Sequence, residues 1–222
     1  VTLDINDLDD TAPTITSAVT AEAINENSGA GQVIYTVTAD DSADVADTPI
    51  AYSLAEGSDA ALSIDASTGA VTLATDPDHE TQSQFSFSVI ATDAAGNASE
   101  AQSVTLDINN LDEVSPVFLT SVSDYEIGDG SASGQVILTA QADDTGDISN
   151  GVTFSLLEGD LLDPALSIDP STGEVILNES PDFDTKSSYS FTVLAEDGVN
   201  TGVVKHFTLN VVNIDEVAPT IT

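Results

Sequence analysis

Three short segments of the chain each carry two acidic residues, four and three positions ahead of a proline. The pairs are Asp9 with Asp10, Asp112 with Glu113, and Asp215 with Glu216. None of the segments contains a basic residue, and carboxylates this close repel each other by roughly one to several kcal/mol, depending on the local dielectric. Carboxylate oxygens are hard ligands, and Ca²⁺ takes about six to eight of them. We therefore expect these segments to take part in cation binding.

The whole chain shares this imbalance, with 39 acidic residues against two lysines and a formal net charge of −37 at pH 7. Nucleic acid is excluded as a partner because phosphate binding needs clustered Lys and Arg, and an anionic membrane surface would repel the chain. Such a composition indicates disorder, a salt-adapted acidic surface or cation binding. Disorder is disfavoured because 41% of the residues are hydrophobic and fall in alternating runs. A salt-adapted surface stays open and is compatible with cation sites.

The chain contains no cysteine, methionine or tryptophan. The lack of cysteine excludes disulfides, thiolate metal sites and a cysteine nucleophile. No stretch approaches the ~20 apolar residues of a membrane span, and residues 1–24 lack the basic and apolar regions of a signal peptide. Because the chain opens within its own repeat unit, we expect it to be part of a longer protein.

An internal repeat divides the chain. Pro13, Pro116 and Pro219 lie 103 residues apart, and between them "GQVIYTVTADD" (31–41) matches "GQVILTAQADD" (134–144). "ALSIDASTGAVTL" and "FSFSVIATD" recur later as "ALSIDPSTGEVIL" and "YSFTVLAED". A unit of about a hundred residues can bury its own core, so we predict tandem domains. We assign residues 1–10 to the end of a preceding repeat, 11–113 and 114–216 to two complete domains, and 217–222 to the start of a following repeat.

Within each unit the hydrophobic period is two, which predicts strands. We expect four inward stripes. Two are matched between the repeats, namely Phe85, Phe87, Val89 and Ala91 in the first and Tyr189, Phe191, Val193 and Ala195 in the second. The other two are Val33, Tyr35, Val37 and Ala39, followed later by Val104, Leu106 and Ile108. Short β-branched and aromatic runs between Gly, Asp and Ser turns predict an all-β fold, with two tandem Greek-key β-sandwich domains of Ig-like architecture. "IDASTGAV" and "IDPSTGEV" predict hairpin turns in which Gly69 and Gly173 supply a positive φ.

The acidic residues gather at the ends of the predicted strands. Strands that alternate in direction bring their ends together at two opposite poles of a sandwich. One pole of the first domain is expected to hold the C-terminal acidic segment together with Glu26, Asp78 and Glu80. The other is expected to hold the N-terminal acidic segment together with Asp41, Asp44 and Asp93. When such domains follow one another, the acidic segment lies between two acidic poles.

The order of these motifs resembles that of tandem cadherin repeats over nearly the whole chain. Cadherin linkers read D-x-N-D-N-x-P, and "NLDEVSP" (110–116) fills the corresponding slots. The family's D-R-E triplet is similar to "DHE" (78–80) and "DFD" (182–184), its early glutamate to Glu26, and its A-x-D strand end to "ATD" (91–93) and "AED" (195–197). The wording "IDPSTGEV" and "LDEVSP" is most similar to cadherin-like repeats of large bacterial surface adhesins of the RTX type.

The resemblance implies that the two domains are joined end to end by a linker that binds Ca²⁺. The implied junction ligands are Glu26, Asp78, Glu80, Asn110, Asp112, Glu113, Val114, Asp144, Asp147, Asn150 and Asp197. An N-terminal half site is implied at Asp9, Asp10, Asp41, Asp44 and Asp93, and a C-terminal half site at Asp129, Asp182, Asp184, Asp215 and Glu216. Glu113 and Asp147 would bridge neighbouring ions.

The chain departs from the family pattern at several of these positions. The family's D-x-D after the second strand has two intervening residues here, so Asp40 and Asp143 are alternatives for the inner ligand role. The second domain has Asp129 at the position of Glu26, with Glu126 as a second candidate. Because the chain lacks tryptophan, the tryptophan-anchored strand exchange of vertebrate cadherins does not carry over.

Two other kinds of function use some of the same residues. "DHE" offers acid–base groups, but a catalytic histidine needs an orienting partner and a nucleophile. Phe183 stands at the His79 position of the second domain, which indicates a variable exposed position, and we predict no enzyme. A carbohydrate-binding module would need exposed aromatic rings, for which Tyr125, Phe118 and Phe183 are the candidates.

The resemblance implies a calcium-binding extracellular adhesin repeat that acts as a Ca²⁺-stiffened spacer at a cell surface. The expected partners are calcium ions, neighbouring repeats of the same chain, and a cell-surface or polysaccharide ligand. Direct Ca²⁺-dependent homophilic adhesion and carbohydrate binding are the alternatives.

Overall fold

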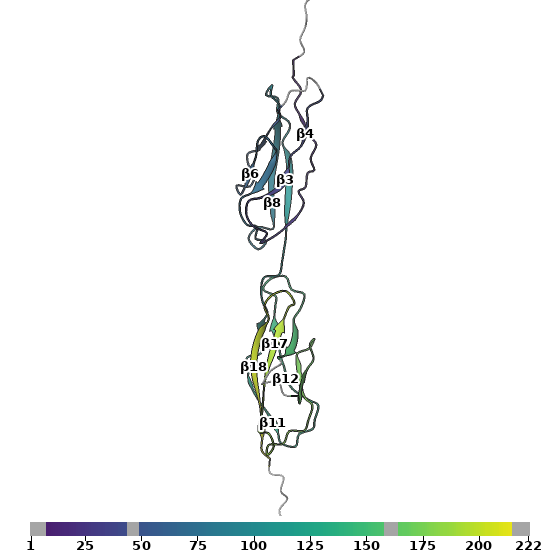
Figure 1. The fold of residues 1–222 in the computed structure, drawn as a ribbon, viewed down its shortest axis with the longest axis vertical. Coiled ribbons are helices and arrows are strands. Elements are labelled where there is room, and N and C mark those ends of the chain that lie inside the picture. Colours follow the sequence, from purple (N-terminus) through teal and green to yellow (C-terminus); the bar gives the residue numbers. More distant parts are fainter. Residues whose placement is uncertain (1–7, 44–48, 158–163, 215–222) are drawn as a thin grey trace, which may run out of the picture. The chain divides into compact units, whose positions relative to one another are not determined.

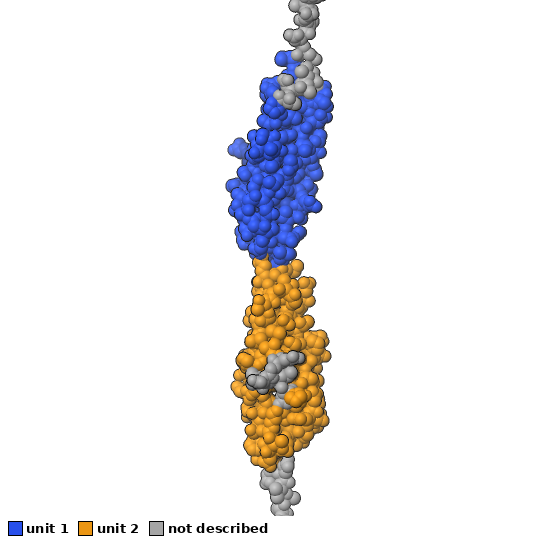
Figure 2. All heavy atoms as spheres, viewed as in Figure 1, with its two compact units in different colours: residues 1–111 blue, residues 112–222 orange. Residues whose placement is uncertain are grey.

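The two repeats form two compact units in the computed structural model, which describes residues 8–43, 49–157 and 164–214. Unit 1 comprises residues 1–111 and unit 2 residues 112–222 (Figure 2). All regular elements within the described ranges are strands, which confirms the all-β class. These ranges accordingly include no helix with the length and hydropathy needed to cross a membrane.

Unit 1 is built from short strands that form two larger sheets and one short pair (Figure 1). Its strands are β1 (Thr14–Ile15), β2 (Ile24–Asn25), β3 (Gln32–Thr36), β4 (Ala39–Asp40), β5 (Ala51–Leu54), β6 (Leu62–Ile64), β7 (Ala70–Leu73), β8 (Gln84–Thr92) and β9 (Gln102–Asn109). The four-stranded sheet has the order β2-β9-β8-β5, the three-stranded sheet the order β3-β7-β6, and β1 pairs with β4.

Unit 2 repeats this topology strand for strand. Its strands are β10 (Val117–Phe118), β11 (Asp124–Gly128), β12 (Gln135–Thr139), β13 (Ala142–Asp143), β14 (Thr153–Leu156), β15 (Leu166–Ile168), β16 (Glu174–Leu177), β17 (Ser188–Glu196) and β18 (Val203–Val212). The sheet orders are β11-β18-β17-β14 and β12-β16-β15, with β10 paired to β13. The sequence repeat is therefore a repeat of structure.

A hydrophobic core lies between the two sheets of each unit, which makes each a β-sandwich. In unit 1, Phe87 and Val89 of β8 belong to the same buried cluster as Val71 and Leu73 of β7. The predicted stripes of β8 and β9 are at most 5% exposed, and that of β17 at most 1%. Burying one such side chain stabilises a fold by about 1.5–3 kcal/mol. The long antiparallel hairpins β8–β9 and β17–β18 thus provide a rigid frame.

One predicted stripe is wrong at its first residue. Val33 is 61% exposed, whereas its neighbour Ile34 is 7% exposed and lies in the core. The reason is a β-bulge, because the register shifts between Val33 opposite Thr72 and Tyr35 opposite Val71. The extra residue in the bulged strand reverses which side chains point inward. Unit 2 has the same shift between Val136 and Leu138.

The predicted turns between β6 and β7, and between β15 and β16, are confirmed. Asp65 Oδ1 accepts the Ser67 hydroxyl at 2.6 Å and the amides of Ser67 and Thr68 at 2.9 Å. Gly69 has φ +72°, and a Cβ there would lie 2.6 Å from the Val37 carbonyl oxygen. Only glycine fits both the conformation and the space. Unit 2 repeats the turn with Gly173 at φ +71°.

The first part of each unit crosses from one sheet to the other. β1 pairs antiparallel with β4, and the chain then pairs parallel with β9 through β2. Gln102 Nε2 donates to the Ser17 carbonyl at 3.0 Å, and in unit 2 Lys205 Nζ donates to the Thr120 carbonyl. These bonds fix the segment that leads from each acidic pair into its sandwich.

Candidate metal centres

Three carboxylates converge at one end of unit 2. Asp112 precedes β10, Asp144 directly follows β13, and Asp197 directly follows β17. One oxygen of each lies within 4.8 Å of the others. Asp144 and Asp197 are buried, at 5% and 9% exposed. The fold therefore brings together three of the predicted junction residues, which are far apart in sequence.

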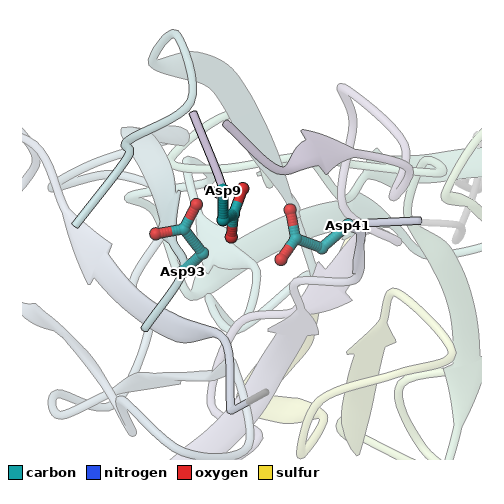
Figure 3. Close-up of side chains that lie close together, drawn as sticks. All are labelled: Asp9, Asp41 and Asp93. Carbon is teal, nitrogen blue, oxygen red and sulfur yellow. The ribbon is translucent and has the colours of Figure 1, made fainter. Parts of the chain in front are cut away.

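The same arrangement occurs in unit 1. Asp9 precedes β1, Asp41 directly follows β4, and Asp93 directly follows β8. Their oxygens also lie within 4.8 Å of one another, and Figure 3 shows the three side chains close together. Asp9 and Asp93 are buried, whereas Asp10 is exposed. The same three-aspartate cluster occurs in both units, so it is a property of the repeat.

Adjacent aspartates at the ends of β4 and β13 have different contacts. Asp143 Oδ1 accepts the Thr145 amide at 3.2 Å and the Thr145 hydroxyl at 2.8 Å, and Asp40 binds the serine two positions on in the same manner. Successive side chains of a strand point to opposite faces. When Asp143 caps the turn, Asp144 therefore points into the cluster. The second aspartate of each pair is the one that faces the other carboxylates.

Hydrogen bonds favour the ionised form of the strand-end aspartates. Asp197 Oδ1 accepts the amides of Val199 and Asn200 at 2.7 Å, and the Val199 bond is the largest cause of a lowered pKa for Asp197. Burial by itself raises the pKa of Asp93, but bonds from the side chain and amide of Asn97 outweigh it and the pKa is lowered. Both clusters therefore retain negative charge at neutral pH.

Two buried oxygens of the unit 2 cluster have no hydrogen-bond donor within the described ranges, namely Asp112 Oδ2 and Asp144 Oδ1. The second oxygen of each is bonded, Asp112 Oδ1 to the Asn200 side chain and Asp144 Oδ2 to the Ser149 hydroxyl at 2.6 Å. Burying a carboxylate oxygen without a partner is costly. A hard divalent cation would be such a partner, and the oxygen-only donor set fits Ca²⁺.

Residues 112–114, called the strap from here on, are fastened to unit 2. The Glu113 amide donates to Asp147 Oδ2 at 3.3 Å. A Cβ at Gly146 would lie 3.1 Å from Val114 Cγ1, so this glycine leaves room for Val114. The structure thus places Asp147 against the strap. Asn150, also predicted as a ligand, is exposed in the same loop.

At the other end of unit 1, Glu26 is only 1% exposed. Its Oε2 accepts the His79 amide at 2.7 Å and its Oε1 the Leu111 amide at 2.5 Å. Burial alone raises the pKa of Glu26, but the bonds from Leu111 and His79 outweigh it and the pKa is lowered. The predicted ligand is therefore also a buried anchor that joins two segments of unit 1.

Three further predicted ligands lie near this end of unit 1. Asn110 Nδ2 donates to Glu80 Oε1 at 3.1 Å, and Glu80 in turn contributes to the lowered pKa of Glu26. Asp78 is exposed, and its two oxygens accept the amide and hydroxyl of Thr81 at 2.9 Å. Glu26, Glu80 and Asn110 are thus brought together, while Asp78 caps a turn.

Asp129 takes the place of Glu26 in unit 2. The Phe183 amide donates to Asp129 Oδ1 at 3.1 Å, the counterpart of one of the two amide bonds to Glu26. Glu126, the alternative from the sequence, is exposed on β11. The shorter side chain of Asp129 reaches one backbone amide among the described residues, where Glu26 reaches two.

The remaining predictions for the C-terminal half site are only partly described. Asp182 Oδ2 accepts the Thr185 hydroxyl at 2.7 Å, and this bond is the largest cause of a lowered pKa for Asp182. Asp184 is exposed. Asp44, Asp215 and Glu216, which the sequence predicts for the two half sites, lie outside the described residues.

Two asparagines that touch the carboxylate clusters were not among the predicted ligands. Asn200 Nδ2 lies 2.9 Å from Asp112 Oδ1, and Asn97 Nδ2 lies 2.9 Å from Asp93 Oδ2. Both follow a strand-end aspartate in sequence, as "DAAGN" (93–97) and "DGVN" (197–200). The recurrence of asparagine after that aspartate in both repeats was the available signal.

The candidate sugar-binding aromatic residues and His79 are only partly exposed. Phe183 is half-buried and packs against the core, and His79 at the same position of unit 1 is half-buried, so the expectation of an exposed position was wrong. Phe118 and Tyr125 also pack against the core, at 6.5 Å and 6.4 Å between ring centroids from Phe207. None of the three candidate sugar-binding rings stands clear of the sandwich.

Residues 20–109 match the model of the Cadherin domain. Mouse Protocadherin Fat 4 is 28% identical over 216 residues, covering 97% of this chain and 4% of that protein. Human Protocadherin-11 X-linked is 29% identical over 221 residues, covering 97% of this chain and 16% of that protein. The chain therefore spans only a small part of the length of these relatives.

The solved structure of human Protocadherin-24 EC1-2 superposes on this chain with a TM-score of 0.72 at 20% sequence identity. The match covers 92% of this chain and 99% of that one. At this identity the likeness is one of fold. The chain therefore has the fold of two consecutive cadherin domains.

Proposed function

We propose that each unit is a calcium-binding repeat of an extracellular adhesion protein. The observation that carries this proposal is the carboxylate cluster at the N-terminal end of both units. Within the described residues, Asp144 Oδ1 in unit 2 and Asp41 Oδ2 in unit 1 are buried without a hydrogen-bond donor. The cadherin fold and the match over residues 20–109 support the proposal.

The donor set favours calcium over other metals. All cluster ligands are oxygens, and the chain has no cysteine for a softer metal. Ca²⁺ accepts oxygens from several segments in a flexible geometry, whereas Mg²⁺ demands near-octahedral geometry and keeps most of its water. Extracellular modules of this kind bind Ca²⁺ with a Kd of about 10⁻⁴ to 10⁻³ M, so the clusters would be filled at millimolar calcium.

The cluster residues tie separate parts of a unit together. A bound ion supplies positive charge that two lysines cannot provide for 39 acidic residues. Asp112 is the first residue of the strap. Asp144 and Asp197 each follow a strand and are held there by their hydrogen bonds. Sharing one cation removes the mutual repulsion of the three carboxylates and fixes the strap to both strand ends.

We further propose that the strap serves both units and that the chain is a spacer stiffened by Ca²⁺. Glu113 would act with the acids near Leu111, namely Glu26, Asp78 and Glu80, while Asp112 acts within unit 2. The small share of its relatives that the chain covers supports a long parent with many repeats. The segments "IDPSTGEV" and "LDEVSP" support a large bacterial surface adhesin as that parent, located outside the cell.

Calorimetric titration with Ca²⁺ tests the binding proposal. We expect Asp144→Asn to weaken the Ca²⁺ affinity of one site by tenfold or more, because it removes charge from a buried ligand. A tenfold loss corresponds to about 1.4 kcal/mol of binding free energy. Asp143→Asn is the matched control, since Asp143 caps a turn beside the cluster. Unchanged stoichiometry and affinity in Asp144→Asn would refute the assignment.

Small-angle scattering tests the spacer role. A maximum dimension that does not respond to calcium would refute it.

Calcium-dependent self-association is a second candidate function. The middle of the outer face of β8 and β9 carries uncharged residues, with Ser86 opposite Thr105 and Ser88 opposite Ser103, while Asp107 lies at one end opposite Gln84. For a chain of charge −37, copies approach at the lowest electrostatic cost through a face with few acids. Sedimentation velocity should then show dimers in calcium that Ser88→Asp abolishes. A monomer at all concentrations in calcium would exclude this function.

A further inference from the structure

One asparagine in unit 2 connects the strap to a strand end. Asn200 Nδ2 donates to Asp112 Oδ1 at 2.9 Å and to Asp197 Oδ2 at 3.2 Å, and lies 3.4 Å from the Val114 carbonyl oxygen. Two of these acceptors belong to the strap and the third to the residue that follows β17. A single amide group therefore joins two segments that are 88 positions apart in sequence.

Unit 1 places an asparagine in the same position. Asn97 Nδ2 donates to Asp93 Oδ2 at 2.9 Å and to the Asp9 carbonyl at 3.2 Å. Asn97 follows its aspartate by four positions and Asn200 by three, so the loops differ in length. The amide nevertheless reaches the same two partners, the acidic segment and the strand-end carboxylate. The shared feature is the position of the amide rather than the loop.

The chemistry of an amide suits this position. Its NH₂ group is a neutral donor of two hydrogen bonds, so it draws two anionic segments together without adding charge. An aspartate of the same shape would add a carboxylate and no donor. Asn200 engages Asp112 Oδ1 and Ser149 engages Asp144 Oδ2, so that, among the described residues, Asp112 Oδ2 and Asp144 Oδ1 are buried without a donor. The bond from Asn200 thus leaves Asp112 Oδ2 available to a cation beside Asp144 Oδ1.

We propose that Asn200 and Asn97 are positioning residues that fasten the acidic segment to the strand end before Ca²⁺ arrives, and so set the calcium affinity of each cluster. This role rests on the calcium binding proposed above. The asparagines bind the carboxylates rather than the ion. Partners that orient metal ligands in this way commonly change affinity by about 10- to 100-fold when removed.

Two measurements on the whole chain test the role of Asn200. The first is the calcium affinity of each cluster by calorimetry. The second is the heteronuclear NOE of the Glu113 and Val114 amides in chelator, which reports the order of the strap without any ion. We expect Asn200→Ala to lower the affinity of the unit 2 cluster by about 10- to 100-fold and to lower the NOE of the strap. Asn97→Ala should change only the unit 1 cluster, and thus serves as the reciprocal control.

Further variants separate positioning from other effects. Asn200→Asp keeps the shape but lacks the donor, so the strap should loosen in chelator as in Asn200→Ala. Asn210→Ala, at an exposed position of β18, should change neither measurement. An affinity loss with an unchanged NOE, or no change in either, would overturn the role of Asn200. If the native chain binds no Ca²⁺, the proposed function fails, and the NOE alone decides whether Asn200 fastens the strap.

Discussion

Glu26 Oε1 accepts the backbone amide of Leu111 at 2.5 Å, although the two residues are 85 positions apart. Glu26 directly follows β2, and Leu111 is the last residue of unit 1. A residue proposed as a calcium ligand is therefore also an anchor that holds the chain as it leaves the sandwich. Part of the order at this end of unit 1 is consequently built in without any ion.

Replacing Glu26 by Ala should destabilise unit 1 even in chelator. The change leaves the amides of His79 and Leu111 without their charged acceptor. Hydrogen bonds to charged groups contribute about 1.5–3 kcal/mol each, so we expect the loss of two to lower the free energy of unfolding by about 3–6 kcal/mol in urea titrations. Asp129→Ala should cost unit 2 about half as much, because the described residues give Asp129 one such bond. Equal losses in the two units would contradict the anchor role.

The stability of unit 1 should fall in acid through Asp65. Bonds from the Ser67 hydroxyl, then from the amides of Thr68 and Ser67, lower the pKa of Asp65 from 3.8 to about 2. Because the pKa is lower in the folded state, the stabilisation is complete above about pH 4 and is lost as the pH falls through about 2. The difference in urea midpoint between the native chain and Asp65→Ala should therefore shrink from about pH 5 to pH 2. A difference that stays constant over this range would contradict the assignment.

Gly69→Ala should destabilise unit 1 more than Gly57→Ala does. Both glycines have a positive φ, +72° and +89°, so alanine is strained at either position by about 1 kcal/mol or more. At Gly69 the new Cβ would also lie 2.6 Å from the Val37 carbonyl oxygen, whereas nothing lies within 4 Å at Gly57. Thermal unfolding in chelator measures both. A Gly57 variant that melts lower than the Gly69 variant would contradict the close approach.

Because of the bulge in β3, we expect substitutions of the neighbouring residues Val33 and Ile34 to have opposite effects from those that simple alternation predicts. Val33→Ser should leave the stability of unit 1 within about 0.5 kcal/mol, because Val33 is exposed. Ile34→Ala should cost about 2–5 kcal/mol, because Ile34 lies in the core. Urea unfolding of the two variants distinguishes the bulged register from simple alternation. A larger loss for Val33→Ser would restore the register that the sequence pattern predicts.

Simple alternation predicts the long strands well and the short ones less well. The stripes of β8 and β9 are inward as expected, since nine and eight residues in an unbroken hairpin leave little doubt about the register. In β3, the bulge depends on how the strand pairs with β7. The hydrophobic pattern of β3 alone does not reveal that pairing. Long-range pairing therefore decided what local pattern left undetermined.

The candidate site shows the same limit. The strand-end positions of Asp41 and Asp93 predicted that they meet the N-terminal acidic segment, and the resemblance to cadherin repeats implied that Asp112, Asp144 and Asp197 meet in the second domain. The choice between Asp143 and Asp144 required the turn that Asp143 caps. Asn200 was overlooked because its role depends on a side-chain bond to a segment 88 positions away, and an asparagine in a loop is common.

A crystal structure determined in millimolar calcium tests the central claim most directly. An anomalous difference map should show an ion in each N-terminal cluster, within about 2.3–2.6 Å of the ligand oxygens. In unit 2 these include Asp112 Oδ2 and Asp144 Oδ1, and in unit 1 Asp41 Oδ2. A well-ordered map with no anomalous peak at either cluster would contradict the assignment of these carboxylates as calcium ligands.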